Sequence, residues 1–258
     1  MRSAQPDTVA DRGYAATLSR LAGAQKPAAF GSPAYSRFVN RRIGRYLAAA
    51  AYQLGLTPNQ VTAVSALFSL SGILAVATVR PSWWLGLGVA LALALGYALD
   101  SADGQLARLR GGGSPAGEWL DHVVDSAKIC ALHTAVLISL YRFFDLHTEA
   151  LLLLPIVYQL VDTVAFFAIT LNDQLKRLHG GGELPPVAPS NVRSFLVLPT
   201  DYGVLCLAFV LLGSQTAFLV GYGGLLAVNV VYLLAALVKW YRTMAALGRR
   251  GPVRIDAS

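Results

Sequence analysis

Long apolar blocks that no charged residue interrupts dominate the pattern of the chain. The longest of them are residues 46–79, 81–99 and 202–238. A helix that crosses a lipid bilayer needs about 20 consecutive, mostly apolar residues. The blocks are long enough for membrane-spanning helices, and the pattern predicts an all-α, polytopic membrane protein.

Helix-start and turn signals divide these blocks into six predicted transmembrane helices. Thr57 and Pro58 are suited to the N-cap and the first position of the first helix. The second helix is expected to continue past the membrane face until the Gly-rich stretch 111–115 ends it. A turn at residues 221–224, Gly-Tyr-Gly-Gly, is expected to separate the last two helices. The predicted spans are residues 57–79, 82–99, 118–141 and 149–171, with the fifth beginning near residue 200 and the sixth near residue 222.

A basic, amphipathic segment precedes the first span. Arg37, Arg41, Arg42 and Arg45 alternate with apolar residues, which is typical of a helix that lies in the membrane interface. The alternative is that these arginines only form the basic cytosolic flank of the first span. Residues 1–32 are rich in Ala, Ser, Gly and Pro and are predicted to form a flexible cytosolic tail. A six-helix membrane domain at residues 33–248 and a second cytosolic tail at 249–258 complete the predicted organisation.

Composition and charge agree with a membrane protein and argue against other classes. Hydrophobic residues make up 55% of the chain and charged residues only 14%, whereas soluble domains carry about a quarter charged residues. The net charge of +7 is explained by cytoplasmic loops rich in Lys and Arg, so no nucleic-acid partner is predicted. Cys130 and Cys206 lie in apolar segments and are expected to be small core residues rather than a disulfide framework.

The distribution of Lys and Arg predicts how the chain is oriented. Of the 21 Lys and Arg residues, only Arg80 and Arg142 lie in the turns on one side of the membrane. The positive-inside rule then places both termini, residues 100–128 and the 172–198 loop in the cytoplasm. The predicted location is the cell membrane, with membrane lipids around the spans and the cluster described next facing the cytosol.

Four aspartates gather at the cytosolic ends of the second and third predicted spans. Asp100 and Asp103 are three residues apart, and Asp121 and Asp125 are four apart, so each pair lies on one helix face. The short, Gly-rich connection predicts two antiparallel neighbouring helices whose acidic faces meet. Four converging carboxylates cannot all stay ionised without a cation, and hard divalent ions prefer oxygen ligands. Two such ions would also bridge a diphosphate and stabilise a leaving phosphate.

Small and basic residues stand beside these aspartates. Gly104, Ala107 and Gly117 would let a ligand approach the helix backbones, and Arg108 and Arg110 are suited to phosphate oxygens. The alternatives are close packing between helices for the small residues and a purely topological role for the arginines.

Residues 100–125 resemble the signature of the CDP-alcohol phosphatidyltransferase family, D-x2-D-G-x2-A-R-x8-G-x3-D-x3-D. All eight fixed positions are present within these 26 residues. The six-span layout and the preceding amphipathic helix also agree with that family. The resemblance implies an enzyme of phospholipid biosynthesis that acts as a homodimer. It implies transfer of a substituted phosphate group from a CDP-linked donor to an alcohol, with release of CMP.

The resemblance also assigns roles to individual residues. It implies a requirement for Mg2+ or Mn2+, as two ions, and makes Asp125 both a metal ligand and the general base for the acceptor hydroxyl. The implied metal ligands are Asp100, Asp103, Asp121 and Asp125. The implied CDP-binding residues are Asp100, Gly104, Ala107, Arg108, Gly117 and Asp121.

Two features bear on the acceptor alcohol, and they point in different directions. Residues 114–126 resemble the choline and ethanolamine phosphotransferase branch, which uses a CDP-linked head group and diacylglycerol. His122 would then be a base or an acceptor ligand, unless it only packs at the interface. Lys128, Lys176, Arg177 and Arg193 would instead form a cationic pocket for a phosphorylated acceptor, unless Lys176 and Arg177 only reflect topology and Arg193 is structural. We expect CDP-diacylglycerol as donor and a polyol or polyol phosphate, such as inositol phosphate or glycerol phosphate, as acceptor.

Other polar residues within the spans are expected to have structural roles. Asp162 is expected to pair with another span or a water cavity, His133 to be a satisfied interior histidine, and Asp201 to cap the fifth span. Asn229 and Gln159 are expected to make interhelical hydrogen bonds. A competing class is a cation transporter, because intramembrane carboxylates also mark ion paths. Transporter sites tend to lie at mid-membrane, however, whereas these four aspartates are predicted at one face.

Overall fold

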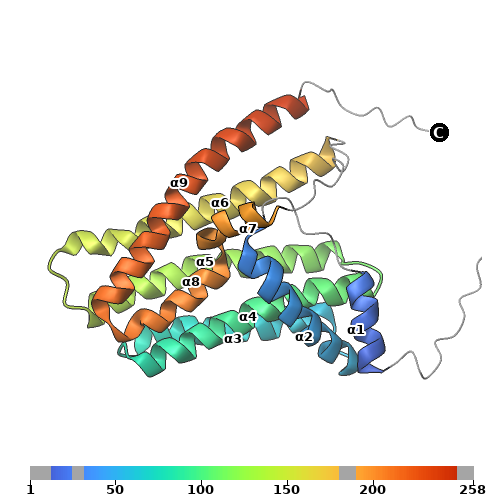
Figure 1. Cartoon of the computed structure of the whole chain (residues 1–258), viewed down its shortest axis with the longest axis horizontal. Helices are drawn as coiled ribbons and strands as arrows, with labels where there is room; N and C mark the ends of the chain where they lie inside the picture. The colour runs from blue at the N-terminus through green and yellow to red at the C-terminus, as the bar shows by residue number, and fades with distance from the viewer. Residues whose placement is uncertain (1–12, 25–31, 180–189, 249–258) are drawn as a thin grey trace, which may run out of the picture.

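Helices account for almost all of the regular structure of the chain. The computed structural model describes residues 13–24, 32–179 and 190–248, and within these ranges it contains no strand (Figure 1). This confirms the predicted all-α class. The α-helices are α1 (Tyr14–Gly23), α2 (Arg41–Gln53), α3 (Pro58–Thr78), α4 (Trp83–Leu109), α5 (Pro115–Phe143), α6 (Leu153–Leu178), α7 (Asn191–Leu196), α8 (Tyr202–Ala208) and α9 (Gln215–Gly248).

Five of the helical segments are long and apolar enough to cross a membrane. They are α3, α4, α5, α9 and the segment Glu149–Leu178, which joins a short 3-10 turn to α6. The first four predicted spans are therefore confirmed as helices, and the protein is a multi-pass membrane protein. Thr57 caps α3 as predicted, because its side chain accepts a hydrogen bond from the backbone N–H of Gln60. Asp201 likewise caps α8 through the backbone N–H of Gly203.

The predicted fifth span is shorter than a regular transmembrane helix. It consists of the seven residues of α8 and the five residues of a 3-10 helix at Phe209–Gly213. At about 1.5 Å and 2.0 Å of rise per residue, the two together reach only about 20 Å, against a hydrocarbon core of about 30 Å. The described residues therefore contain five full-length spans and one shorter helical segment, instead of the six full-length spans that were predicted.

The turn predicted at residues 221–224 is wrong. The chain turns at Ser214, which is in an extended conformation, and α9 then runs without a break through the three glycines. At Gly221, a Cβ atom would lie 2.7 Å from the side chain of Leu211. This glycine therefore serves a close helix contact, a use of glycine that is common in membrane bundles.

The helices form one bundle with two oblique members. In Figure 1, α3, α4, α5 and α8 run side by side, while α6 and α9 cross each other at an angle to them. Helix α3 packs against both α4 and α5, α6 packs against α5 and α9, and α2 crosses α4. The largest side chains buried in the common core are aromatic, namely Tyr158, Phe209, Phe218 and Tyr222.

The flexible tail predicted for residues 1–32 is wrong for the stretch that forms α1. Thr17 and Leu21 of this helix are fully buried, because α1 packs against α2. The Gln53 side chain donates a hydrogen bond to the Thr17 hydroxyl at 2.9 Å. The rest of this predicted tail, at residues 1–12 and 25–31, and the predicted C-terminal tail at 249–258 lie outside the described residues.

The basic segment before the first span is helical, as predicted. A π-helical turn at Ser36–Asn40 leads into α2. Its small residues, among them Gly44, Ala48 and Ala49, are buried, while Arg42 is exposed. At Gly44 a Cβ atom would lie 2.8 Å from the Ser101 hydroxyl, so glycine lets α2 approach α4 closely. The position of this helix in the membrane interface stays a prediction.

Candidate active site

The connection between α4 and α5 brings the two halves of the acidic motif together. Gly111 and Gly112 have φ angles of +98° and +126°, which glycine adopts readily and other residues do not. Ser114 then caps α5, because its hydroxyl accepts a hydrogen bond from the N–H of Gly117 at 3.0 Å. Pro115 occupies the first position of the helix. The predicted end of the second helix at the Gly-rich stretch is therefore confirmed, and α5 begins three residues before the predicted start of the third span at residue 118.

The acidic faces of α4 and α5 meet, although the two helices are not packed tightly against each other. Helix α3 makes extensive contacts with both, whereas α4 and α5 approach each other much less closely. The predicted meeting of the acidic faces is therefore confirmed, at a separation between the two helices that is wider than direct packing would give. The wider separation has a physical reason, since carboxylates need space for a ligand between them and tight packing would desolvate them.

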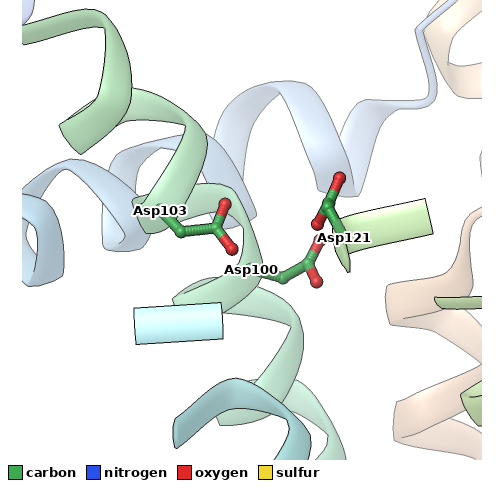
Figure 2. Close-up of side chains that lie close together, drawn as sticks. All are labelled: Asp100, Asp103 and Asp121. Atoms are coloured by element: carbon green, nitrogen blue, oxygen red, sulfur yellow. The ribbon is translucent and has the colours of Figure 1, made fainter. Parts of the chain in front are cut away.

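Three of the four aspartates form a compact group. Asp100, Asp103 and Asp121 each offer a carboxylate oxygen, and these oxygens lie within 4.8 Å of one another. Figure 2 shows Asp100 and Asp103 on α4 turned toward Asp121 on α5. Three converging carboxylate oxygens are the donor set that a hard divalent cation prefers, so these residues could hold a metal ion.

A threonine that was not predicted orients the most buried member of this group. The Thr62 hydroxyl, on α3, donates a hydrogen bond to Asp103 Oδ2 at 2.6 Å. Both residues are buried, with exposed fractions of 4% and 7%. Hydrogen bonds of this kind fix the orientation of metal-ligating carboxylates. The only sequence signal for this contact is that Thr62 lies about one helical turn after Pro58 on α3.

Asp125 lies beside the group of three and is joined to it through Lys128. The Lys128 ammonium contacts Asp100 Oδ1 at 2.8 Å, Asp125 Oδ1 at 3.1 Å and the Ser65 hydroxyl at 3.3 Å. Lys128 itself is only 6% exposed. Its buried charge is thus compensated by two carboxylates. Asp125 is not part of the compact group of Asp100, Asp103 and Asp121, and its role as a metal ligand and base stays a prediction.

One cavity opens on the side of Asp103 and Asp121. It has a volume of about 630 Å³, and we call it the motif cavity because most of its lining belongs to the acidic motif and its loop. Helix α3 adds Thr57, Asn59 and Thr62 to the lining. The four further residues predicted to contact the nucleotide all line it, namely Gly104, Ala107, Arg108 and Gly117. Arg110 lines it as well, so two guanidinium groups stand near the carboxylates.

A second cavity lies on the side of Asp100 and Asp125. It has a volume of about 370 Å³, and we call it the inner cavity. Lys128 belongs to its lining, together with residues of α6, α8 and α9 that are distant in sequence. The two cavities have no lining residue in common, so the aspartates stand between them.

The predicted cationic pocket does not form around the aspartates. Of its four members, Lys128 alone reaches the cluster. Lys176 pairs with Asp173 at 3.9 Å, and Arg177 pairs with Glu118 at 2.7 Å. The Lys176–Asp173 pair lies within α6, where opposite charges three residues apart stabilise neighbouring helix turns. The Arg177–Glu118 pair joins the end of α6 to the start of α5. Arg193 lies exposed on α7 and lines neither cavity.

His122, the other predicted acceptor residue, stays close to the cluster but lines neither cavity. Its Nδ1 atom is 3.6 Å from Asp121 Oδ2, and its ring meets Phe166 edge to face. The five structural predictions for polar residues fare better. Asp201 caps α8, and Asp162 pairs with His133 of another helix. His133 is buried with both ring nitrogens partnered, and Asn229 and Gln159 make hydrogen bonds between helices, as expected. Cys130 and Cys206 are unpaired, and Cys206 is fully buried.

Comparison with known proteins gives a family match and several similar solved structures. Residues 55–242 match the CDP-alcohol phosphatidyltransferase family. The Mycobacterium tuberculosis phosphatidylinositol phosphate synthase PgsA1 with CDP-DAG bound is 20% identical, with a TM-score of 0.46, over 79% of this chain and 94% of that one. Its complex with manganese and citrate is 21% identical, with a TM-score of 0.45, over 79% and 89%. The apo form is 22% identical, with a TM-score of 0.47, over 76% and 94%. No curated protein matches the chain.

The match covers α3, α4, α5, α6 and most of α9, and so includes the acidic motif and both cavities. It leaves out α1 and α2, which pack against the outside of this core. Because the match extends over well more than half of the sequence, the chain belongs to the CDP-alcohol phosphatidyltransferase family.

Proposed function

We propose that this CDP-alcohol phosphotransferase uses CDP-diacylglycerol as donor and transfers its phosphatidyl group to a polyol or polyol phosphate. The observation that carries the proposal is the position of the aspartates between two separate cavities. A transfer reaction needs a donor site and an acceptor site that share the reacting phosphorus. The motif cavity is the larger and has two arginines, which suits a diphosphate.

The group of three carboxylates is suited to a divalent cation, either Mg2+ or Mn2+, and two ions would fit the family chemistry. Asp100, Asp103 and Asp121 would hold the metal, with Asp125 as a further ligand. When bound, the metal supplies charge neutralisation for the diphosphate and for the leaving CMP. Arg108 and Arg110 would bind phosphate oxygens, and the small side chains of Gly104, Ala107 and Gly117 leave room for the nucleotide.

The acceptor would enter from the inner cavity, where Asp125 is available. An acceptor hydroxyl is a weak nucleophile, so Asp125 takes its proton as the hydroxyl oxygen attacks the phosphorus of the phosphatidyl group. The new oxygen–phosphorus bond forms, the bond between that phosphorus and CMP breaks, and CMP leaves with the electron pair. Lys128 holds the carboxylate of Asp125 at 3.1 Å and so orients it toward the cavity that both residues line.

The experiment that tests this function compares two classes of donor. Purified protein is incubated with Mg2+ and either CDP-diacylglycerol plus small alcohols, or CDP-choline and CDP-ethanolamine plus diacylglycerol. We expect CMP release and a new phospholipid only with CDP-diacylglycerol. Product formed only from the CDP-linked head groups would overturn the choice of donor and support the choline and ethanolamine branch.

The location and assembly of the enzyme are part of the same proposal. The distribution of Lys and Arg along the sequence, with only Arg80 and Arg142 in the turns on the other side, supports insertion in the cell membrane with the aspartates facing the cytosol. The resemblance in the motif supports a homodimer. The accessibility of introduced cysteines in sealed vesicles checks the orientation. The mass of the detergent-solubilised protein checks the homodimer.

A further inference from the structure

The lining of the inner cavity contains a carboxylate that the family motif does not include. Asp162 projects from α6 into the lining of this cavity, which Asn229 of α9 and Tyr158 of α6 also line. Its side chain is 21% exposed. A carboxylate within a membrane-spanning helix is costly and is retained where it has a partner or a function. Asp162 therefore needs an explanation beyond packing.

A buried histidine and a tyrosine hold Asp162 in place. The Nε2 atom of His133, on α5, lies 3.0 Å from Asp162 Oδ2. The Nδ1 atom of the same ring lies 2.6 Å from the hydroxyl of Tyr222, on α9. Because an ionised carboxylate can only accept, Nε2 carries the proton and the Tyr222 hydroxyl donates to Nδ1. His133 is fully buried and stacks on Tyr158 at 4.6 Å, so three helices fix the orientation of one carboxylate.

The charges that line the inner cavity are mainly negative. Among the described residues of the lining, the only cationic side chain is Lys128, and it already contacts Asp100 and Asp125. The lining also contains Asp162 and Asp201. Asp201 is satisfied by the chain itself, because its oxygens accept hydrogen bonds from the N–H groups of Gly203 and Ser36. Asp162 differs, because His133 contacts its Oδ2 atom while its Oδ1 atom has no hydrogen-bond partner among the described residues, so Oδ1 is available to a ligand.

These observations, together with the proposed function on which they rest, narrow the class of acceptor. A phosphorylated acceptor would bring further negative charge into a cavity whose described lining holds no arginine, beside a donor that already carries a diphosphate. Like charges at short range in such a site are strongly unfavourable. An unphosphorylated alcohol with a second hydrogen-bond donor would instead satisfy Asp162.

We propose that Asp162, held by His133 and Tyr222, determines acceptor specificity by accepting a hydrogen bond from a second hydroxyl or an ammonium group of an unphosphorylated alcohol. Attack by the first hydroxyl at the phosphorus is unchanged from the reaction above. Asp162 selects and orients the acceptor in the cavity that Asp125 also lines, and it takes no proton in the reaction.

The test uses acceptors in matched pairs with CDP-diacylglycerol and Mg2+. The pairs are glycerol with glycerol 3-phosphate and inositol with inositol 1-phosphate. Serine and ethanolamine are tested as well, as acceptors that carry an ammonium group. We expect phospholipid from an unphosphorylated acceptor, with kcat/KM at least about tenfold above that of a phosphorylated partner. Preference for serine or ethanolamine would identify an ammonium as the group that donates to Asp162. Preference for glycerol or inositol would identify a second hydroxyl as that group.

Variants separate recognition from folding. Asp162→Asn is expected to raise the acceptor KM by about tenfold or more, the effect of losing a charge-assisted hydrogen bond, and to leave the KM for CDP-diacylglycerol within about twofold. Asp162→Glu is expected to restore part of the acceptor binding, and Tyr222→Phe to show a smaller loss of the same kind. The matched control is Asp173→Asn on the same helix, where the carboxylate is exposed and outside both cavities.

The outcomes distinguish this inference from the proposed function. Higher kcat/KM for a phosphorylated acceptor, or equal effects of Asp162→Asn and Asp173→Asn on the acceptor KM, would overturn the inference and leave the function standing. No phospholipid from any acceptor would overturn the proposed function and this inference with it. If Asp162→Asn lowers donor binding as much as acceptor binding, Asp162 is a structural residue and the inference is wrong.

Discussion

The motif cavity and the inner cavity lie on opposite sides of the same aspartates, yet they are built in different ways. The motif cavity takes most of its lining from residues 103–121, with one helical turn of α3 added, and contains two arginines. The inner cavity takes its lining from residues scattered between 69 and 229 and contains one lysine among several carboxylates. The difference teaches that the cavity proposed for the nucleotide is a local feature of the sequence, whereas the cavity proposed for the acceptor depends on the tertiary fold.

Removal of the metal is expected to have the largest effect, because both cavities depend on the shared carboxylates. EDTA should abolish CMP release, and Mg2+ or Mn2+ should restore it, since the donor diphosphate and the leaving group need the positive charge. The measurement is CMP release with CDP-diacylglycerol and an acceptor. Transfer at full rate in EDTA would contradict the claim that the reaction depends on a metal held by the carboxylates between the two cavities.

Loss of the proposed base should affect the chemical step more than donor binding. Asp125→Asn is expected to lower kcat by about 10²–10⁴-fold, the range for loss of general base catalysis, while CDP-diacylglycerol still binds. The measurement pairs single-turnover CMP release with donor binding on the same preparation. Normal turnover of this variant would remove the role of Asp125 in the proposed reaction.

The hydrogen bond from Thr62 on α3 to Asp103 allows a sharper test, because it acts on one of the proposed metal ligands. Thr62→Val keeps the shape of the side chain but removes the donor to Asp103, and should weaken metal affinity by about 10–100-fold. Ser71→Ala is the matched control, because that hydroxyl on α3 bonds only to the backbone of Phe68 and is exposed. The metal concentration for half-maximal activity is the measurement, and equal values for both variants would contradict the role of Thr62.

Arginine substitutions should give the smallest effects. They should distinguish an arginine that lines the motif cavity from an arginine on the protein surface. Arg108→Ala is expected to raise the KM for the donor by about tenfold, because one charged contact to phosphate is lost. Arg193→Ala is expected to change both KM values by less than about twofold, since Arg193 lines neither cavity. A large and selective effect of Arg193→Ala on the acceptor KM would restore the predicted cationic pocket.

The predictable part of the molecule rests on short-range rules. Thr57 and Ser114 are residue types that cap helices, and each of them precedes a helix in the structure. The spacings of three and four residues place each pair of aspartates on one helix face. These rules were enough to find four of the transmembrane helices and the group of Asp100, Asp103 and Asp121. They were enough because each depends on residues a few positions apart.

The features that the sequence did not reveal depend on long-range contacts. Helix α1 is ordered by burial of Leu21 against the bundle, although its composition suggested a tail. The glycines at 221–224 lie within α9 rather than in a turn, and Gly221 makes room for the Leu211 side chain. Thr62 and Asp162 gain their partners from other helices. A partner on another span was expected for Asp162, but the sequence does not identify it as His133, and it gives little sign of the contact between Thr62 and Asp103.

The most direct test of the central claim is a titration of Mn2+ by electron paramagnetic resonance on the purified protein. The claim is that Asp100, Asp103 and Asp121 share one cation-binding site. We predict saturable binding that Asp121→Asn weakens by at least about tenfold, with no change in Asp173→Asn, whose carboxylate is exposed elsewhere. Equal Mn2+ affinity in the wild type and Asp121→Asn would contradict the account.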